Sequence, residues 1–247
     1  MRFMRFMRFT FAASIASSLF VSAFAVGDAL TLLQDDFSFE PEGVDAVDPS
    51  NATSPWYARV EIGVNLMDDL DPGSDLGQFH LHPGVDGAVS IGYHLTDRIA
   101  IEAQAGGSWN RFKEWTQGTK PALDASGNLI QVPLVANVVF RVPLTSQSLE
   151  PIFGEDAELL LYGGGGGEYA NGTLSAENED VFTIDGWTFR YHVGAALNAQ
   201  LADNVKFGLY ARISRTGSLD ATQPAAGDIS FSALMNYAVG MNLSFSF

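Results

Sequence analysis

The stretch WTFRYHVGAALNAQL, residues 187–201, alternates between apolar and polar side chains at every second position. Its apolar positions are Trp187, Phe189, Tyr191, Val193, Ala195, Leu197 and Leu201, and the intervening polar positions include Thr188, Arg190, His192, Asn198 and Gln200. Successive side chains of a β-strand point to opposite faces of the sheet. A period of two therefore predicts a strand with one apolar and one polar face.

Seven further segments have the same period, and they follow one another from Trp56 to the C-terminus. They are residues 56–66, 85–95, 98–109, 130–142, 157–169, 205–213 and 230–247. In the last segment the apolar positions run without a break from Phe231 through Met235 to Phe247. The sequence therefore predicts eight strands and an all-β fold.

Five consecutive glycines, Gly163 to Gly167, lie within the segment 157–169. A phosphate-binding loop needs a lysine and a serine or threonine just after its glycines, followed by a helix. Here Glu168 follows, and its charge would oppose a phosphate. Glycine inside a strand commonly marks a bend or the close approach of another strand. We therefore interpret the glycines as the middle of the fifth strand.

The connections between the predicted strands alternate in length. Thr96 and Asp97 form one tight turn, and residues 202–204 form another. The connections after the first, third, fifth and seventh strands are long, polar and acidic, as in residues 67–84 and 111–128. Residues 143–156 are an exception, because this connection should be short and is not. Short turns at one end and long loops at the other are typical of outer-membrane barrels.

Alternation alone does not say which face of such a barrel points outward. A soluble barrel of the lipocalin type would enclose the apolar face around a ligand. The polar face here is crowded with small residues and carries charges of both signs, which suits a narrow interior. Aromatic residues also fall at strand ends on the apolar face, where the two membrane interfaces would lie, and these are Trp56, Trp109, Tyr169, Trp187 and Phe247. The sequence thus favours a barrel with its apolar face toward lipid.

The N-terminal quarter has a different composition. Three arginines precede the apolar run 10–21, and small residues follow at Ala23 and Ala25, which is the pattern of a secretory signal peptide over residues 1–25. A membrane-anchoring helix is the alternative, but the run is too short to span a bilayer. Residues 26–53 are rich in Asp, Glu and Pro and predict an acidic flexible segment. Residues 54–247 form the predicted barrel.

Composition adds two limits. The formal net charge is -16, so the chain should repel nucleic acid, and we expect no nucleic-acid partner. The chain contains no cysteine, which leaves no disulfide framework and no thiolate metal ligands.

Three parts of the sequence resemble the eight-stranded outer-membrane β-barrel family, which includes opacity-type surface proteins and the OmpA transmembrane domain. They are HPGVDGAVSIGYHLTDRIAIEAQAG at residues 82–106, VPLVANVVFRV at 132–142 with the glycine-rich strand after it, and the terminal aromatic Phe247. The resemblance covers residues 54–247. It implies an eight-stranded antiparallel up-and-down transmembrane β-barrel in the bacterial cell outer membrane, with both termini in the periplasm.

The resemblance also implies partners. These are outer-membrane lipid, lipopolysaccharide and the outer-membrane assembly machinery, for which Phe247 resembles the recognition signal. The chain departs from the family in its long fourth connection. It also lacks an appended peptidoglycan-binding domain, so the resemblance does not extend to cell-wall tethering.

Charged side chains on the polar face form the candidate site. An eight-stranded barrel has an interior just wide enough for side chains to fill it. We therefore expect a lumen charge network of Arg59, Glu61, Glu102, Arg141, Glu158, Glu168, Arg190, His192, Lys206 and Arg212.

Several functions remain compatible with this pattern. A structural or surface-interaction barrel with a closed lumen is favoured, and the alternative is a narrow channel for small solutes. An outer-leaflet lipid A deacylase-like enzyme would need a nucleophile and a base that face lipid, whereas His94 and His192 fall on the lumen side. A calcium site is a further alternative, formed by Asp68, Asp69, Asp71, Asp75, His80 and His82, but their spacing does not match an EF-hand. We expect no catalytic residues, cofactor or resident metal, and the extracellular partner stays unknown.

Overall fold

The computed structural model describes residues 55–72, 77–116, 122–144, 157–176, 179–223 and 227–247. All of them belong to one compact unit, Pro49–Phe247. The predicted signal peptide, residues 1–25, and the acidic segment, residues 26–53, lie outside the described residues, as does most of the connection 143–156. Within the described ranges, no helix is long and apolar enough to cross a membrane.

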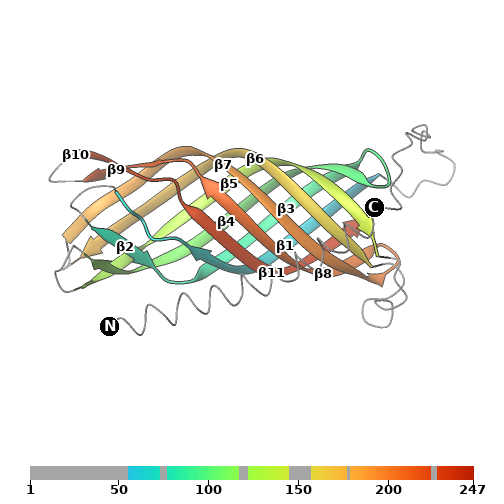
Figure 1. The fold of residues 1–247 in the computed structure, drawn as a ribbon, viewed down its shortest axis with the longest axis horizontal. Coiled ribbons are helices and arrows are strands. Elements are labelled where there is room, and N and C mark those ends of the chain that lie inside the picture. The colour runs from blue at the N-terminus through green and yellow to red at the C-terminus, as the bar shows by residue number, and fades with distance from the viewer. Residues whose placement is uncertain (1–54, 73–76, 117–121, 145–156, 177–178, 224–226) are drawn as a thin grey trace, which may run out of the picture. The chain divides into compact units, whose positions relative to one another are not determined.

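Eight antiparallel strands form a closed ring (Figure 1). In ring order they are β1 (Trp56–Met67), β3 (Gly84–His94), β4 (Ile99–Thr116), β5 (Leu123–Pro143), β6 (Glu158–Ala176), β7 (Glu179–Ala202), β8 (Val205–Thr216) and β11 (Met235–Ser246). The ring closes because β11 pairs with both β8 and β1. The predicted all-β, eight-stranded up-and-down barrel is confirmed.

The pairing register fixes the tilt of the strands. One row of paired residues leaves β7 at Ala195 and passes through Ala211, Val239, Val64, Val85, Trp109, Ile130 and Asn171. It returns to β7 at Asp185, so one circuit shifts the row from residue 195 to residue 185. A shift of ten residues over eight strands corresponds to a tilt of about 40° from the barrel axis, as in other membrane barrels.

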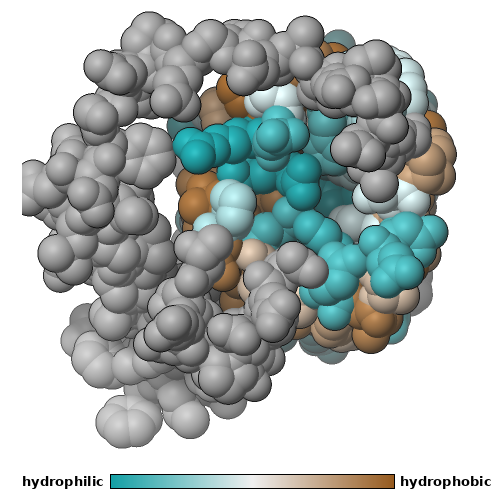
Figure 2. All heavy atoms as spheres, turned by 90° about the vertical axis from the view of Figure 1, so that its right-hand side faces the viewer, coloured by the Kyte–Doolittle hydropathy of each residue, from teal (hydrophilic) through white to brown (hydrophobic). Residues whose placement is uncertain are grey.

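The outer surface of the ring is an apolar band. Large apolar side chains are exposed at many of the alternate, outward positions of the strands, as in Ile62 (65% exposed), Val193 (62%) and Leu209 (59%). The aromatic residues Trp56, Tyr93 and Phe247 lie at the end with the short turns and form the first aromatic belt. Trp109, Tyr169 and Trp187 lie toward the other end and form the second aromatic belt. Figure 2 looks at the end that carries the C-terminus, where hydrophilic residues occupy the middle of the ring and apolar residues its wall. This is the arrangement that the alternation predicted.

The polarity of the two faces reverses beyond the second aromatic belt. Strands β4 to β7 continue there, and β2 (Gln78–Leu81), β9 (Leu219–Gln223) and β10 (Gly227–Phe231) add to the sheet. Inward residues become apolar and form a packed cluster that we call the apolar cap. Its buried members are Leu70, Phe79, Phe112, Leu129, Ala170, Leu174, Phe182, Ile184, Leu219, Ala221, Phe231 and Leu234.

Two predictions are corrected by this extension. Residues 67–84 and 111–128 are not simply polar loops, because β2 lies in the first stretch and β4 and β5 continue through most of the second. Phe231 does not share the lipid-facing row of Met235, because it belongs to β10 and is only 1% exposed within the apolar cap. Apolar side chains point outward in the membrane band and inward in the cap. A search for one continuous alternating pattern therefore ends each strand at the second aromatic belt.

The five glycines lie in the middle of β6, as predicted. A Cβ added at Gly164 would lie 2.1 Å from the backbone oxygen of Ala136, and one added at Gly166 would lie 2.1 Å from that of Leu134. On the outer side, the ring of Phe189 approaches Gly165. The glycines therefore allow the close approach of the neighbouring β5 backbone and, on the outer face, of aromatic side chains.

Candidate functional site: the charged lumen

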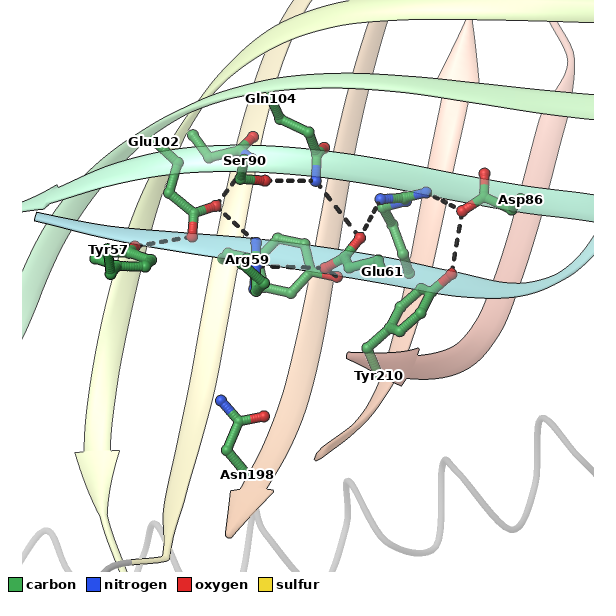
Figure 3. Close-up of polar contacts among 12 residues, drawn as sticks. Tyr57, Arg59, Glu61, Asp86, Ser90, Glu102, Gln104, Asn198 and Tyr210 are labelled. Carbon is green, nitrogen blue, oxygen red and sulfur yellow. Dashed lines mark hydrogen bonds and ion pairs between the residues drawn. The ribbon is translucent and has the colours of Figure 1, made fainter. Parts of the chain in front are cut away.

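A chain of ion pairs crosses the middle of the lumen (Figure 3). Arg59 Nη2 lies 2.6 Å from Glu102 Oε2, and Arg59 Nε lies 3.5 Å from Glu61 Oε1. On the other side of Glu61, Arg212 Nη1 lies 2.8 Å from Glu61 Oε2, and Arg212 Nη2 contacts Asp86. These five side chains come from β1, β3, β4 and β8 and are buried. We call them the central network.

Three tyrosines complete the central network, one for each carboxylate. Tyr57 donates its hydroxyl proton to Glu102 at 2.8 Å, and Tyr210 donates to Asp86 at 3.1 Å. The hydroxyl of Tyr162 lies 3.5 Å from Glu61, and its ring lies beneath the guanidinium of Arg59. A buried carboxylate is tolerated when charged and neutral donors satisfy it together.

Each of these tyrosines lies over a glycine of a nearby strand. A Cβ at Gly92 would lie 2.2 Å from the ring of Tyr57, and one at Gly194 would lie 2.4 Å from the ring of Tyr162. A Cβ at Gly63 would lie 2.7 Å from the hydroxyl of Tyr210. The glycines therefore provide the space in which the tyrosine rings reach the carboxylates.

A separate ion pair lies between the central network and the apolar cap. Arg190 of β7 lies 2.5 Å from Glu168 of β6 and also donates to the hydroxyl of Ser214. Gln131 donates to the second oxygen of Glu168 at 2.8 Å. Arg190 and Glu168 are buried, and with Gln131 and Ser214 they join β5, β6, β7 and β8 through hydrogen bonds inside the lumen.

The third group lies near the end with the short turns. Glu158 accepts from Arg141 Nη2 at 2.8 Å and lies 2.9 Å from Lys206 Nζ. The side chains of Arg141 and Lys206 are 25% and 21% exposed, so this group borders the mouth of the lumen. Across the three groups, the ion pairs join five cations, Arg59, Arg141, Arg190, Lys206 and Arg212, with five carboxylates, Glu61, Asp86, Glu102, Glu158 and Glu168.

The structure places all ten predicted lumen residues on the inner side and nine of them in ion pairs. His192 is the exception, because it is buried against the edge of Tyr162 and its Nε2 has no hydrogen-bond partner. Sequence analysis missed Asp86 as a network member, although its position on the polar face of segment 85–95 was a usable signal. It also missed the roles of the three tyrosines, for which a tyrosine opposite a glycine was the signal.

The loop end holds a second polar arrangement. His80 Nδ1 lies 2.7 Å from Asp69 Oδ2, and its Nε2 lies 3.2 Å from the hydroxyl of Thr116. These contacts tie β2 to β4 and to the segment after β1. Of the residues considered for calcium, Asp69 and His80 form an ion pair, and Asp75 lies outside the described residues. Within the described part of the chain, no group of three or more potential metal ligands occurs.

A closed ring with an apolar outer band and an ionic interior defines a membrane-embedded β-barrel. Residues 16–247 match the family model for the outer membrane protein beta-barrel domain, and the chain belongs to this family. It is therefore an outer-membrane β-barrel protein, located in the bacterial outer membrane. Among curated proteins, none matches the chain.

Solved structures of outer-membrane proteins are similar to this chain at low sequence identity. Neisserial surface protein A is 11% identical with a TM-score of 0.45, over 78% of this chain and 98% of that one. The outer membrane protein OprG from Pseudomonas aeruginosa is 13% identical with a TM-score of 0.47, over 78% of this chain and 96% of that one. The outer membrane protease OmpT from Escherichia coli is 9% identical with a TM-score of 0.42, over 78% and 96%. At such identities the similarity concerns the fold alone.

Proposed function

We propose that this protein is a structural and surface-presenting barrel of the outer membrane whose lumen is closed to solutes. The observation that supports this role is the presence of two barriers in series. The first consists of the central network and the Glu168–Arg190 pair, and the second is the apolar cap.

The two barriers oppose permeation for different reasons. To pass the first, a solute must separate buried ion pairs, and breaking one such pair costs about 3–5 kcal/mol. To pass the second, a hydrated solute must enter a cluster in which Leu129, Phe182 and Ile184 are fully buried. Apolar constrictions exclude water and ions by dewetting. Opening one barrier alone would leave the other in place.

The proposal includes an orientation. The first and last residues of the barrel sequence both lie beside the short turns. The amide of Ser246 donates to the carbonyl of Asn204 in one such turn, and the amide of Phe247 donates to the carbonyl of Trp56. In outer-membrane barrels the short turns are periplasmic. Both termini are then periplasmic, and the apolar cap with its polar outer face is extracellular. Cysteine labelling of intact cells tests this orientation, because we expect Asp220→Cys to react with an impermeant maleimide and Asp97→Cys not to react.

The proposed partners follow from this location. Outer-membrane lipid contacts the apolar band, lipopolysaccharide contacts the outer face near the second aromatic belt, and the assembly machinery recognises Phe247. Nucleic acid is not among the partners.

The proposal assigns no enzymatic activity. Asp69, His80 and Thr116 are ordered like an acid, a base and a nucleophile, but acyl transfer also requires preorganised donors for an oxyanion. Their contacts are accounted for by the attachment of β2 to its neighbours. The unmodified protein and Thr116→Ala should both show esterase activity no higher than that of lipid vesicles without protein.

Single-channel recording in planar bilayers tests the proposed function. We expect no conductance steps from the refolded protein, from Arg212→Ala or from Phe182→Ala. The double variant Arg212→Ala/Phe182→Ala removes one side chain from each barrier, and of these four proteins it alone should show conductance steps. Regular steps from the unmodified protein would instead establish the alternative, a narrow channel for small solutes.

A further inference from the structure

Six outward residues of β6 and β7 lie as three consecutive cross-strand pairs at the second aromatic belt. They are Tyr169 with Trp187, Asn171 with Asp185, and Thr173 with Thr183. We call this surface the β6–β7 patch. From belt to cap, it passes from an aromatic pair through an amide and a carboxylate to two hydroxyls.

The aromatic pair offers an open ring face. Trp187 is 67% exposed, and its ring centroid lies 5.6 Å from that of Tyr169 with an angle of 50° between the planes. The two rings therefore form a tilted platform, not a closed stack. The apolar faces of sugar rings fit such platforms, because an aromatic face carries negative charge density toward the C–H groups of its partner.

Polar groups are held directly beyond the platform. The hydroxyl of Tyr169 donates to Asp185 Oδ1 at 2.5 Å, which fixes the carboxylate beside the aromatic rings. Asn171 is exposed, as is Asp185, with which it pairs across the two strands. An amide and a carboxylate provide both donors and acceptors, which pairs of sugar hydroxyls require. Preorganised groups of this kind lose little entropy on binding.

The height of the patch selects the source of the sugar. Two residues along a strand tilted by about 40° rise about 5 Å, so the Asn171–Asp185 and Thr173–Thr183 pairs lie about 5 and 10 Å beyond the belt. Aromatic belts lie at the level of the lipid headgroups. The patch is therefore continuous with the lipid-facing band and faces sideways at the depth where headgroup sugars begin.

The charge of the patch distinguishes sugar from phosphate. Its six residues include one carboxylate and no basic side chain. A phosphate would meet repulsion from Asp185, whereas a sugar hydroxyl can donate to it.

We propose that the β6–β7 patch binds the sugar headgroup of an outer-leaflet glycolipid. Trp187 and Tyr169 contact the face of an uncharged headgroup sugar beyond the phosphorylated lipid, and Asp185 and Asn171 hydrogen-bond its hydroxyls. This proposal rests on the orientation given in the proposed function. It adds a defined contact surface and a ligand class to it.

Binding of glycolipids to the full-length refolded protein in detergent tests the proposal. Two probes are compared by native mass spectrometry, a rough lipopolysaccharide that retains its inner-core sugars and lipid A that lacks them. Trp187→Leu keeps an apolar side chain at the lipid boundary, and Asp185→Ala removes the held carboxylate. Trp56→Leu is the matched control, because it removes an exposed aromatic residue at the opposite belt. A heat-dependent gel shift verifies that each variant is folded.

We expect the unmodified protein and Trp56→Leu to prefer the sugar-bearing probe. Trp187→Leu and Asp185→Ala should each bind it about tenfold more weakly, as expected for the loss of one good contact, and should bind lipid A as before. Equal affinity of the unmodified protein for both probes would overturn the proposal, as would unchanged binding by both patch variants. Equally tight binding of the free inner-core oligosaccharide would also overturn it, because the ligand would then be a soluble glycan. Conductance is measured separately, so a conducting barrel would refute the closed lumen and leave this result standing.

Discussion

Replacing Arg59 by methionine removes the cation at the centre of the lumen and retains an unbranched side chain. Arg59 is 0% exposed and contacts Glu102 at 2.6 Å and Glu61 at 3.5 Å. In the variant, the hydroxyl of Tyr57 and the amide of Asn137 remain as donors to Glu102 among the described residues, whereas Glu61 keeps Arg212. Loss of one partner from a buried pair costs about 3–5 kcal/mol. We expect the free energy of unfolding to fall by this amount.

Denaturant unfolding in lipid vesicles, followed by tryptophan fluorescence, measures the change. Lys113→Met is the control, because its ammonium lies 3.0 Å from Glu114 in a pair whose side chains are 27% and 29% exposed. Such a pair contributes less than about 1 kcal/mol. Adding Glu102→Gln to Arg59→Met should recover part of the loss, since it removes the uncompensated charge. If Arg59→Met costs no more than Lys113→Met, the central network does not stabilise the barrel.

The remaining predictions concern the glycine run, the cap and the terminus. Gly164→Ala should lower the free energy of unfolding by about 1–3 kcal/mol, because the added Cβ meets the backbone of β5. Gly163→Ala should be nearly neutral, because the nearest contacts of its Cβ are 3.5 Å away. Equal unfolding curves for the two variants would contradict the close approach. Phe182→Ala should lower stability by about 3–5 kcal/mol, since the ring is fully buried against Phe79, Phe112 and Phe231, with the exposed Thr222→Ala as the unaffected control. Deletion of Phe247 should reduce the amount of heat-modifiable barrel in the outer membrane, and unchanged amounts would remove its assigned role.

Most of the barrel was predictable because lipid and lumen impose opposite polarity on alternating side chains. In residues 187–201 the odd positions are apolar, and Trp187, Phe189, Tyr191, Val193 and Leu201 among them are exposed in the structure. In the continuation of the same strand, Phe182 and Ile184 are the buried apolar positions, and they are even-numbered. Between the cap part of the strand and residues 187–201, the strand passes from water into lipid. Its outward face is therefore polar in the cap part and apolar in the lipid part. A single alternating pattern cannot represent this change, which is why the cap strands were predicted as loops.

The lumen was predictable by face but not by partner. Alternation places Glu61, Glu102 and Arg212 inside, yet it does not give the height of each side chain along the barrel. That height depends on the register of neighbouring strands, and the ten-residue shift around the ring follows from the pairing of all eight strands. Asp86 meets Arg212 across a separation of 126 residues in the sequence. His192 shows the converse case, because its face was predicted but its lack of an ionic partner was not.

Labelling with an apolar photoprobe in native outer-membrane vesicles tests the inside-out arrangement most directly. Val193, Leu209 and Val239 are exposed on the outer wall of β7, β8 and β11, whereas His192, Arg212 and Asn236 of the same strands are buried in the lumen. We predict that the probe modifies the first three residues and spares the second three. Labelling of the lumen set with protection of Val193, Leu209 and Val239 would contradict a barrel that presents its apolar face to lipid.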